Sequence, residues 1–156
     1  ILGMTNEEVL SGIASVQATG GRSNIMRLAD KTIIDDCYNA NPVSMKASLD
    51  VLSTALGRKV AILGDMGELG ADEAALHYTV GEHAAAKQID LLLCVGTLSE
   101  EFVKGAKAVK PEMNAHQFST KEDLLAKLPE FLTDGDSILI KASHFMQFEK
   151  IVKALQ

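Results

Sequence analysis

The sequence predicts an α/β domain in which helices cover both faces of a mostly parallel sheet. Strand-like and helix-like runs alternate along most of the chain, and neighbouring parallel strands need crossover connections of this kind. The chain has 156 residues, of which 47% are hydrophobic, so it is long and apolar enough to bury one sizeable core. We therefore expect three layers with the sheet in the middle.

The predicted elements follow a Rossmann-like order. Strands are expected at residues 24–28, 31–36, 59–63, 90–95, 115–118 and 136–140. Helices are expected at residues 43–55, 72–87, 98–109, 120–131 and 145–155. Only Ala29 and Asp30 separate the first two strands, which predicts an N-terminal antiparallel hairpin strand beside the parallel ones.

The first twenty residues differ from the rest of the chain. Thr5 and Glu8 have capping-box spacing, and apolar residues at helical spacing follow, so a short amphipathic helix is predicted. Gly20 and Gly21 then interrupt the pattern and indicate a linker. The chain opens without a methionine, as a piece of a longer protein would. We expect residues 1–20 to belong to a preceding domain and its linker.

The composition excludes several classes of partner. Lys and Arg total 15 against 21 Asp and Glu, and this net charge of -6 opposes binding to nucleic acid. The apolar runs are far shorter than the roughly 18 residues that a membrane span needs, so no membrane insertion is expected. Cys37 and Cys94 lack CxxC spacing, which gives little support to a disulfide or a zinc site and favours a reducing cytoplasm.

Three loops qualify as the place where a ligand binds, because open α/β sheets bind ligands beyond the carboxyl ends of their strands. These loops are residues 35–42, 64–71 and 141–144. In the first, Asn41 and Pro42 form a preferred start of a helix, so they either serve as a helix cap alone or also contact a ligand. Asp36 is either an exposed turn residue or a carboxylate that accepts hydrogen bonds from a ribose diol, and the residues leave both open.

The second loop carries glycines at its first, fourth and seventh positions. A dinucleotide-binding loop needs them at the first, third and sixth, and Asp65 and Glu68 would repel a pyrophosphate, so we reject that kind of site. In the third loop, Lys141 beside a helix N-terminus would attract a carboxylate or phosphate. The alternative is that Ser143 caps the helix and Lys141 is a solvated surface charge.

No complete catalytic or metal-binding motif occurs in the sequence. It contains neither GxxxxGK[ST], the loop that cradles ATP phosphates, nor the nucleophile motif GxSxG. Glu73 and His77 share a helix face, but such a pair is more often a surface ion pair than a set of metal ligands. We expect no metal site and no catalysis by this domain alone.

Three motifs, taken in order, resemble the Mur ligase family. They are Gly21-Arg22, the run from Asp35 to Met45, and the run from Gly64 to Gly70. Residues 141–144 look like a variant of the family's Lys-Gly-Ser-Arg segment, with Ala142 in place of glycine and His144 in place of arginine. The resemblance extends from residue 1 to about residue 155. Its first two motifs are specific to the members that join D-alanyl-D-alanine to UDP-N-acetylmuramoyl-tripeptide.

The resemblance implies the C-terminal domain, residues 21–156, of an ATP-dependent amide ligase of peptidoglycan synthesis in the cytoplasm. Residues 1–20 would be the tail of a central ATPase domain, which would hold ATP with Mg²⁺. An N-terminal domain and this central domain would be its partners within the same protein. ATP would convert the tripeptide carboxylate to an acyl phosphate, which the amine of the dipeptide would attack.

The resemblance also implies roles for individual residues. Arg22 would contact the ATP phosphates and Asp36 the ribose. The incoming dipeptide would be bound by Asn39, Asn41, Pro42, Lys141, Ser143 and His144. Two alternatives remain: a stand-alone flavodoxin-like binding or regulatory module, and the equivalent domain of a folylpolyglutamate-type ligase.

Overall fold

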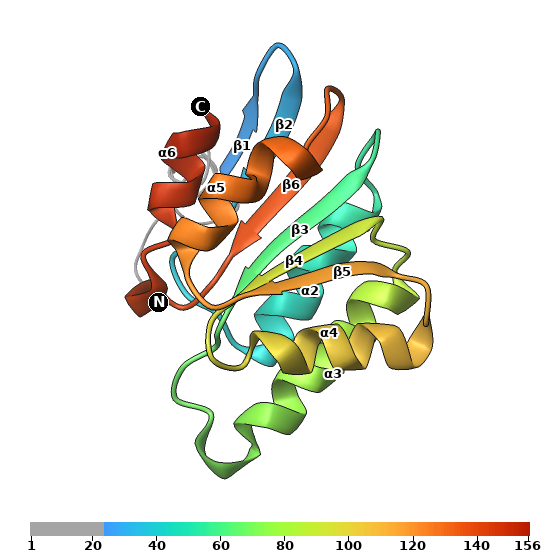
Figure 1. The fold of residues 1–156 in the computed structure, drawn as a ribbon, viewed down its shortest axis with the longest axis vertical. Coiled ribbons are helices and arrows are strands. Elements are labelled where there is room, and N and C mark those ends of the chain that lie inside the picture. The colour runs from blue at the N-terminus through green and yellow to red at the C-terminus, as the bar shows by residue number, and fades with distance from the viewer. Residues whose placement is uncertain (1–23) are drawn as a thin grey trace, which may run out of the picture.

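The computed structural model describes residues 24–156, which form a six-stranded sheet with helices on both faces (Figure 1). This arrangement confirms the predicted three-layer α/β fold. The helix expected after Thr5, the linker at Gly20, the domain boundary after it and the proposed ATP contact Arg22 all lie outside the described residues.

The sheet combines one antiparallel pair with four parallel pairs. Its strands are β1 (Asn24–Arg27), β2 (Lys31–Asp35), β3 (Lys59–Gly64), β4 (Leu91–Val95), β5 (Asn114–Phe118) and β6 (Asp136–Lys141). Their order across the sheet is β1-β2-β6-β3-β4-β5, and only β1 and β2 are antiparallel. The predicted hairpin is therefore confirmed. The last strand along the chain, β6, lies between β2 and β3.

Two sets of helices bury the two faces of the sheet. The helices are α2 (Pro42–Ser53), α3 (Glu73–Ala86), α4 (Ser99–Val109), α5 (Lys121–Phe131) and α6 (Glu149–Leu155), with short 3-10 helices at Gly70–Asp72 and His144–Met146. Side chains of α2, α3 and α4 join one buried cluster and those of α5 and α6 the other (Figure 1). Alternation along β3 explains this division, because Ala61 belongs to the first cluster and Ile62 to the second. None of the helices among residues 24–156 is long and apolar enough to cross a membrane.

Helices α3 and α4 pack unusually close because each places a glycine against the other's backbone. A Cβ added to Gly81 would lie 2.0 Å from the carbonyl oxygen of Phe102, and one added to Gly105 would lie 2.0 Å from that of Tyr78. Side chains at either position would force the helices apart. The two glycines therefore determine the spacing of this helix pair.

The prediction of a helix at residues 145–155 is wrong about where that helix begins. Residues His144–Met146 form a 3-10 turn, Gln147 adopts a left-handed φ of 52°, and α6 begins only at Glu149. The turn brings Phe148 into the core, where its ring lies so close to Gly64 that an added Cβ would be 2.5 Å away. Burial of this ring, which the local pattern does not reveal, ends the turn and delays the helix.

Candidate functional site

The three predicted loops meet at the carboxyl ends of β2, β6 and β3, which are neighbours in the sheet. The first and third loops are joined by an ion pair between Lys141 Nζ and Asp36 Oδ2 at 2.6 Å. The second and third are joined by a hydrogen bond from the Gly67 N–H to Ser143 Oγ at 2.8 Å. Residues that are far apart in the sequence therefore form one site.

Lys141 is the last residue of β6 and is 2% exposed. Besides its ion pair with Asp36, its ammonium donates a hydrogen bond to the carbonyl oxygen of Asn39 at 2.9 Å. The same oxygen of Asp36 accepts a bond from Ser48 Oγ at 2.6 Å. The alternative of a solvated surface lysine is wrong. The expected helix N-terminus beside Lys141 is absent as well, since residues 144–146 form a 3-10 turn.

Ser143 joins all three loops. Its hydroxyl accepts the bond from Gly67 and lies 3.3 Å from the carbonyl oxygen of Ala40, to which it donates. Its backbone N–H donates to the carbonyl oxygen of Asp65 at 3.2 Å. The side chain makes no capping bond, so the expectation that Ser143 caps a helix through its hydroxyl is wrong. Long-range bonds occupy the hydroxyl instead.

Asn41 and Pro42 start α2 as their residue types predict. Asn41 Oδ1 accepts the Ser44 N–H at 2.9 Å, while Ser44 Oγ accepts the Asn41 N–H at 3.1 Å, a reciprocal capping box. Pro42 is the first residue of the helix. Asn39 Oδ1 accepts the neighbouring N–H of Ala40 at 2.8 Å. Capping accounts for the conformation here, and contacts of these side chains with a substrate stay a prediction.

Asp65 is a residue of the site that the sequence analysis assigned no role. Its buried carboxylate accepts hydrogen bonds from the Thr97 N–H at 2.8 Å, the Thr97 hydroxyl at 3.1 Å and the Leu98 N–H at 3.2 Å. Gly96, with a φ of 127°, makes the approach possible, because a Cβ there would lie 2.4 Å from the carboxylate. A carboxylate after one strand and a glycine after the next were the available signal. Asp65 ties the loop after β3 to the loop after β4.

His77 holds the same loop from the opposite side. It is fully buried and accepts the Met66 N–H on Nε2 at 2.9 Å, while its Nδ1 lies 2.6 Å from the carbonyl oxygen of Glu73. Both bonds form only when Nδ1 carries the proton and the ring is neutral. The interpretation of Glu73 and His77 as a surface ion pair is therefore wrong.

The joined loops surround two neighbouring hollows. The first, called here the loop pocket, has a volume of about 440 Å³ and is lined by Tyr38, Asn39, Gly67, Glu68, Ser143, His144 and Phe145. The second, the Asp36 pocket, has a volume of about 390 Å³ and is lined by Asp36, Tyr38, Asn39, Asn41, Ser44, Ala47, Ser48 and Lys141. Tyr38 and Asn39 border both. Most of the predicted site residues thus line one or other of two adjacent hollows.

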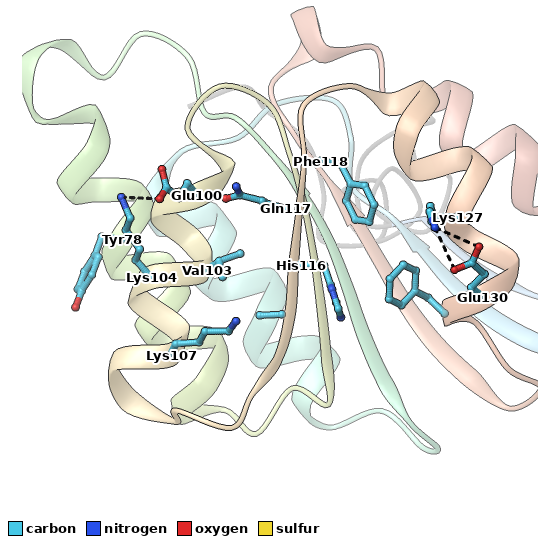
Figure 2. Close-up of a pocket in the computed structure, with 12 residues that line it drawn as sticks. Tyr78, Glu100, Val103, Lys104, Lys107, His116, Gln117, Phe118, Lys127 and Glu130 are labelled. Atoms are coloured by element: carbon cyan, nitrogen blue, oxygen red, sulfur yellow. Dashed lines mark hydrogen bonds and ion pairs between the residues drawn. The ribbon is translucent and has the colours of Figure 1, made fainter.

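A larger hollow, of about 890 Å³, follows the outer edge of β5 (Figure 2). Four of its charged side chains form two ion pairs: Lys104 with Glu100 at 3.1 Å and Lys127 with Glu130 at 3.4 Å. Burial lowers the pKa of His116, so this ring is neutral near pH 7. None of the predicted site residues lines this hollow, so the joined loops are the candidate functional site.

The described residues offer no metal site. Among residues 24–156, no group of three His, Cys, Asp or Glu side chains is arranged to hold a metal ion. Cys37 and Cys94 are both free and buried. Burial raises the pKa of Cys37 to about 12, with a further contribution from the bond to Asp35, and burial also raises the pKa of Cys94. Both thiols are protonated at neutral pH.

A mostly parallel sheet with polar loops joined at the carboxyl ends of its strands is the general architecture of an α/β ligand-binding domain. The family model described as "Mur ligase, glutamate ligase domain" matches residues 21–144, and the chain belongs to this family. This membership favours the ligase hypothesis over a stand-alone flavodoxin-like module.

Curated relatives share sequence with nearly the whole chain. It is 36% identical to the UDP-N-acetylmuramoyl-tripeptide--D-alanyl-D-alanine ligase of Escherichia coli and 34% identical to that of Bacillus subtilis. The matches cover 99% and 98% of this chain but 34% of each relative. The chain therefore spans about a third of the length of these enzymes.

Solved structures agree with this membership. MurF from Acinetobacter baumannii superposes with a TM-score of 0.87 at 32% identity, covering 99% of this chain and 34% of that one. MurF from Thermotoga maritima in complex with ADP gives 0.78 at 26% identity, covering 98% and 34%. A folylpolyglutamate synthase/dihydrofolate synthase from Yersinia pestis gives 0.65 at 16% identity, covering 99% and 35%, which shows the common fold alone.

Proposed function

We propose that residues 21–156 are the C-terminal domain of an ATP-dependent ligase that joins D-alanyl-D-alanine to UDP-N-acetylmuramoyl-tripeptide in the cytoplasm. Residues 1–20 are then the end of the preceding domain. The observation that carries the proposal is sequence identity: two relatives that are 36% and 34% identical over almost the entire chain are both UDP-N-acetylmuramoyl-tripeptide--D-alanyl-D-alanine ligases. The two adjacent hollows at the joined loops support it, because the reaction brings a nucleotide and an amine together.

The chemistry proposed for the whole enzyme has two steps. The γ-phosphoryl group of ATP transfers to the terminal carboxylate of the tripeptide, which gives an acyl phosphate and ADP. The dipeptide amine then attacks the acyl carbon, and the tetrahedral intermediate collapses with loss of phosphate and one proton to give the amide. In this scheme the C-terminal domain binds and orients the reactants, since no nucleophile or acid–base pair is assigned to it.

The Asp36 pocket has a hydrogen-bond acceptor suited to the hydroxyl groups of the ATP ribose. Asp36 presents a carboxylate to this hollow, and a carboxylate can accept bonds from both hydroxyls of a ribose. Lys141 and Ser48 keep the carboxylate in place through its Oδ2 atom. Because Lys141 is itself buried in these bonds, we propose that it acts by holding Asp36 and Asn39, and that its effect on substrates passes through them.

The phosphates and Mg²⁺ are proposed to bind mainly outside the described residues. Residues 24–156 provide neither a cluster of three potential metal ligands nor a phosphate-cradling loop. When bound, the metal ion would neutralise charge on the phosphates during phosphoryl transfer. Arg22 remains the proposed contact of this chain with the phosphates.

The dipeptide is proposed to bind in the loop pocket and beside it. Asn39, Ser143 and His144 line this hollow, whereas Asn41 lines the neighbouring Asp36 pocket and Pro42 follows it as the first residue of α2. A volume of about 440 Å³ lies within the roughly 300–1,000 Å³ of sites for small ligands.

Steady-state assays of the full-length protein test this function. We expect ADP release that requires both UDP-N-acetylmuramoyl-tripeptide and D-alanyl-D-alanine, and none from the isolated 156-residue chain. The matched control is L-alanyl-L-alanine at the same concentrations. Equal rates with the control dipeptide, or ATP turnover by the isolated chain after removal of contaminating ATPases, would contradict the proposal.

A further inference from the structure

The loop pocket has aromatic walls. The rings of Tyr38 and His144 lie with centroids 6.0 Å apart at an interplanar angle of 47°. Phe145 is 62% exposed and lies over Gly67, where an added Cβ would be 2.9 Å from its ring. Aromatic faces attract cations through the negative potential of the ring. The walls of this hollow therefore favour a positively charged group.

Among residues 24–156, Glu68 is the only carboxylate that lines the loop pocket. Within residues 24–156 no lysine, arginine or histidine forms an ion pair with it. The acidic residues around the β5 hollow differ, because Glu100 and Glu130 are neutralised by lysines. The charge of Glu68 thus acts on whatever enters the pocket.

The loop on which Glu68 lies is held in place on three sides. The Gly67 N–H is bound by Ser143, the Met66 N–H by His77, and the Asp65 carboxylate by the loop after β4. Glu68 itself has a φ of 62°, in the left-handed region that a residue with a side chain seldom adopts. Such a conformation persists only where neighbouring contacts impose it, so the carboxylate starts from a defined backbone position.

We propose that Glu68 is the specificity-determining residue that receives the ammonium group of the amine substrate in the loop pocket. The inference rests on the proposed function, in which that substrate is D-alanyl-D-alanine. Glu68 supplies the opposite charge, and the rings of Tyr38 and Phe145 supply the surrounding aromatic surface. The role is one of binding and orientation: the bound ammonium releases one proton to solvent before its nitrogen attacks the acyl carbon, and no proton transfer is assigned to Glu68.

The charge of Glu68 also determines which way round a dipeptide enters. A free dipeptide carries an ammonium at one end and a carboxylate at the other, and a carboxylate beside Glu68 would be repelled. The amino end is therefore directed to Glu68 and the carboxylate away from it.

The test uses the full-length protein with Glu68→Gln, which removes the charge and keeps the shape. The matched control is Glu73→Gln, the same change at an exposed position that does not line the pocket. We expect Glu68→Gln to raise the KM for D-alanyl-D-alanine about ten-fold or more, with the KM for ATP and for the tripeptide unchanged. The control should behave as the wild type in all three.

A second readout separates recognition of the amine from structural damage. N-acetyl-D-alanyl-D-alanine lacks the ammonium, so calorimetry in the presence of an ATP analogue should find it bound by the wild type at least ten-fold more weakly than the free dipeptide. In Glu68→Gln this difference should nearly vanish. A variant that merely loosens the loop would weaken both ligands and keep the difference.

The outcomes distinguish this inference from the proposed function. An unchanged KM for the dipeptide in Glu68→Gln, or an amine preference that survives the substitution, would overturn the role of Glu68 and leave the ligase function standing. Wild-type protein that binds the dipeptide through Glu68 but forms no product would overturn the ligase function alone. Wild-type protein that does not bind the dipeptide at all would overturn both.

Discussion

The two ends of β6 each carry an ion pair with a buried member, but of these two pairs only the one at the carboxyl end lines a hollow described above. At the amino end, Asp136 is fully buried, and Arg58 binds both of its carboxylate oxygens at 2.8 Å. At the carboxyl end, Lys141 is equally buried and pairs with Asp36 at 2.6 Å. Lys141 and Asp36 line a hollow of about 390 Å³.

The two interactions are of the same kind, so the difference lies in their position. The ion pair that borders a hollow is the one at the carboxyl end of the strand. Loops at the carboxyl ends of β2, β3 and β6 lead toward helix starts and leave polar groups around an open space. At the amino end, by contrast, the pair joins Arg58, just before β3, to Asp136 at the start of β6. We therefore expect the amino-end pair to contribute to stability alone and the carboxyl-end pair to stability and substrate binding.

Lys141→Met should have the largest effect. It leaves the Asp36 carboxylate, whose side chain is 13% exposed, without its cation, and breaking such a pair costs about 3–5 kcal/mol of folding free energy. Urea unfolding of the chain measures this loss. In the full-length protein, the fraction that folds should also show a lower kcat/KM for the dipeptide.

The matched control for Lys141 is the double variant Lys141→Met with Asp36→Leu, which removes both charges. It should regain much of the lost stability, because no buried charge is left without a partner. Equal instability of the single and double variants would show that packing of the lysine stem, and not the ion pair, is what matters at this position.

Asp136→Asn should have a smaller effect, about 1.5–3 kcal/mol, because Arg58 is partly exposed and can return to water. Burial by itself raises the pKa of Asp136, but the bonds from Arg58 and Thr133 outweigh it and hold that pKa below its ordinary value. The full contribution is therefore present above the ordinary pKa of an aspartate, about 4, and is lost as the pH falls through the lowered value.

Urea midpoints measured from pH 7 down to pH 3 check this prediction. The wild-type midpoint should fall in the acid range, and the Asp136→Asn midpoint should fall less. Kinetic constants of the folded full-length variant should match the wild type. A raised KM for any substrate would remove the distinction between the two ends of β6.

The smallest effects are expected for two serines, one at each end of β6, whose substitution by alanine compares the two ends directly. Ser137 Oγ donates to the carbonyl oxygen of Leu56 at 2.7 Å near the amino end, and Ser143 joins the loops at the carboxyl end. Ser137→Ala and Ser143→Ala should each cost about 1 kcal/mol of stability. Only Ser143→Ala should also raise the KM for the dipeptide, by several-fold in a steady-state assay. Equal effects on the dipeptide would contradict the division.

The sequence by itself determined the local features of this protein. Alternating patterns located the strands and helices, and Asn41 with Pro42 marked the start of α2, because both signals depend on neighbours a few residues away. The rule for parallel sheets then directed attention to the three loops that do meet. The start of α6 escaped this reasoning, since it depends on burial of Phe148 against Gly64.

Only the tertiary structure decided which side chains in those loops touch. Lys141 and Asp36 are 105 residues apart, and they pair because β6 inserts between β2 and β3, an order that no local pattern encodes. The contact of Asp65 with Thr97 depends in turn on the pairing of β3 with β4, which brings the loops after these two strands together. Short-range propensities fix what each segment becomes, whereas burial and hydrogen bonding between distant segments fix which charges are paired and which, like Glu68, face a hollow.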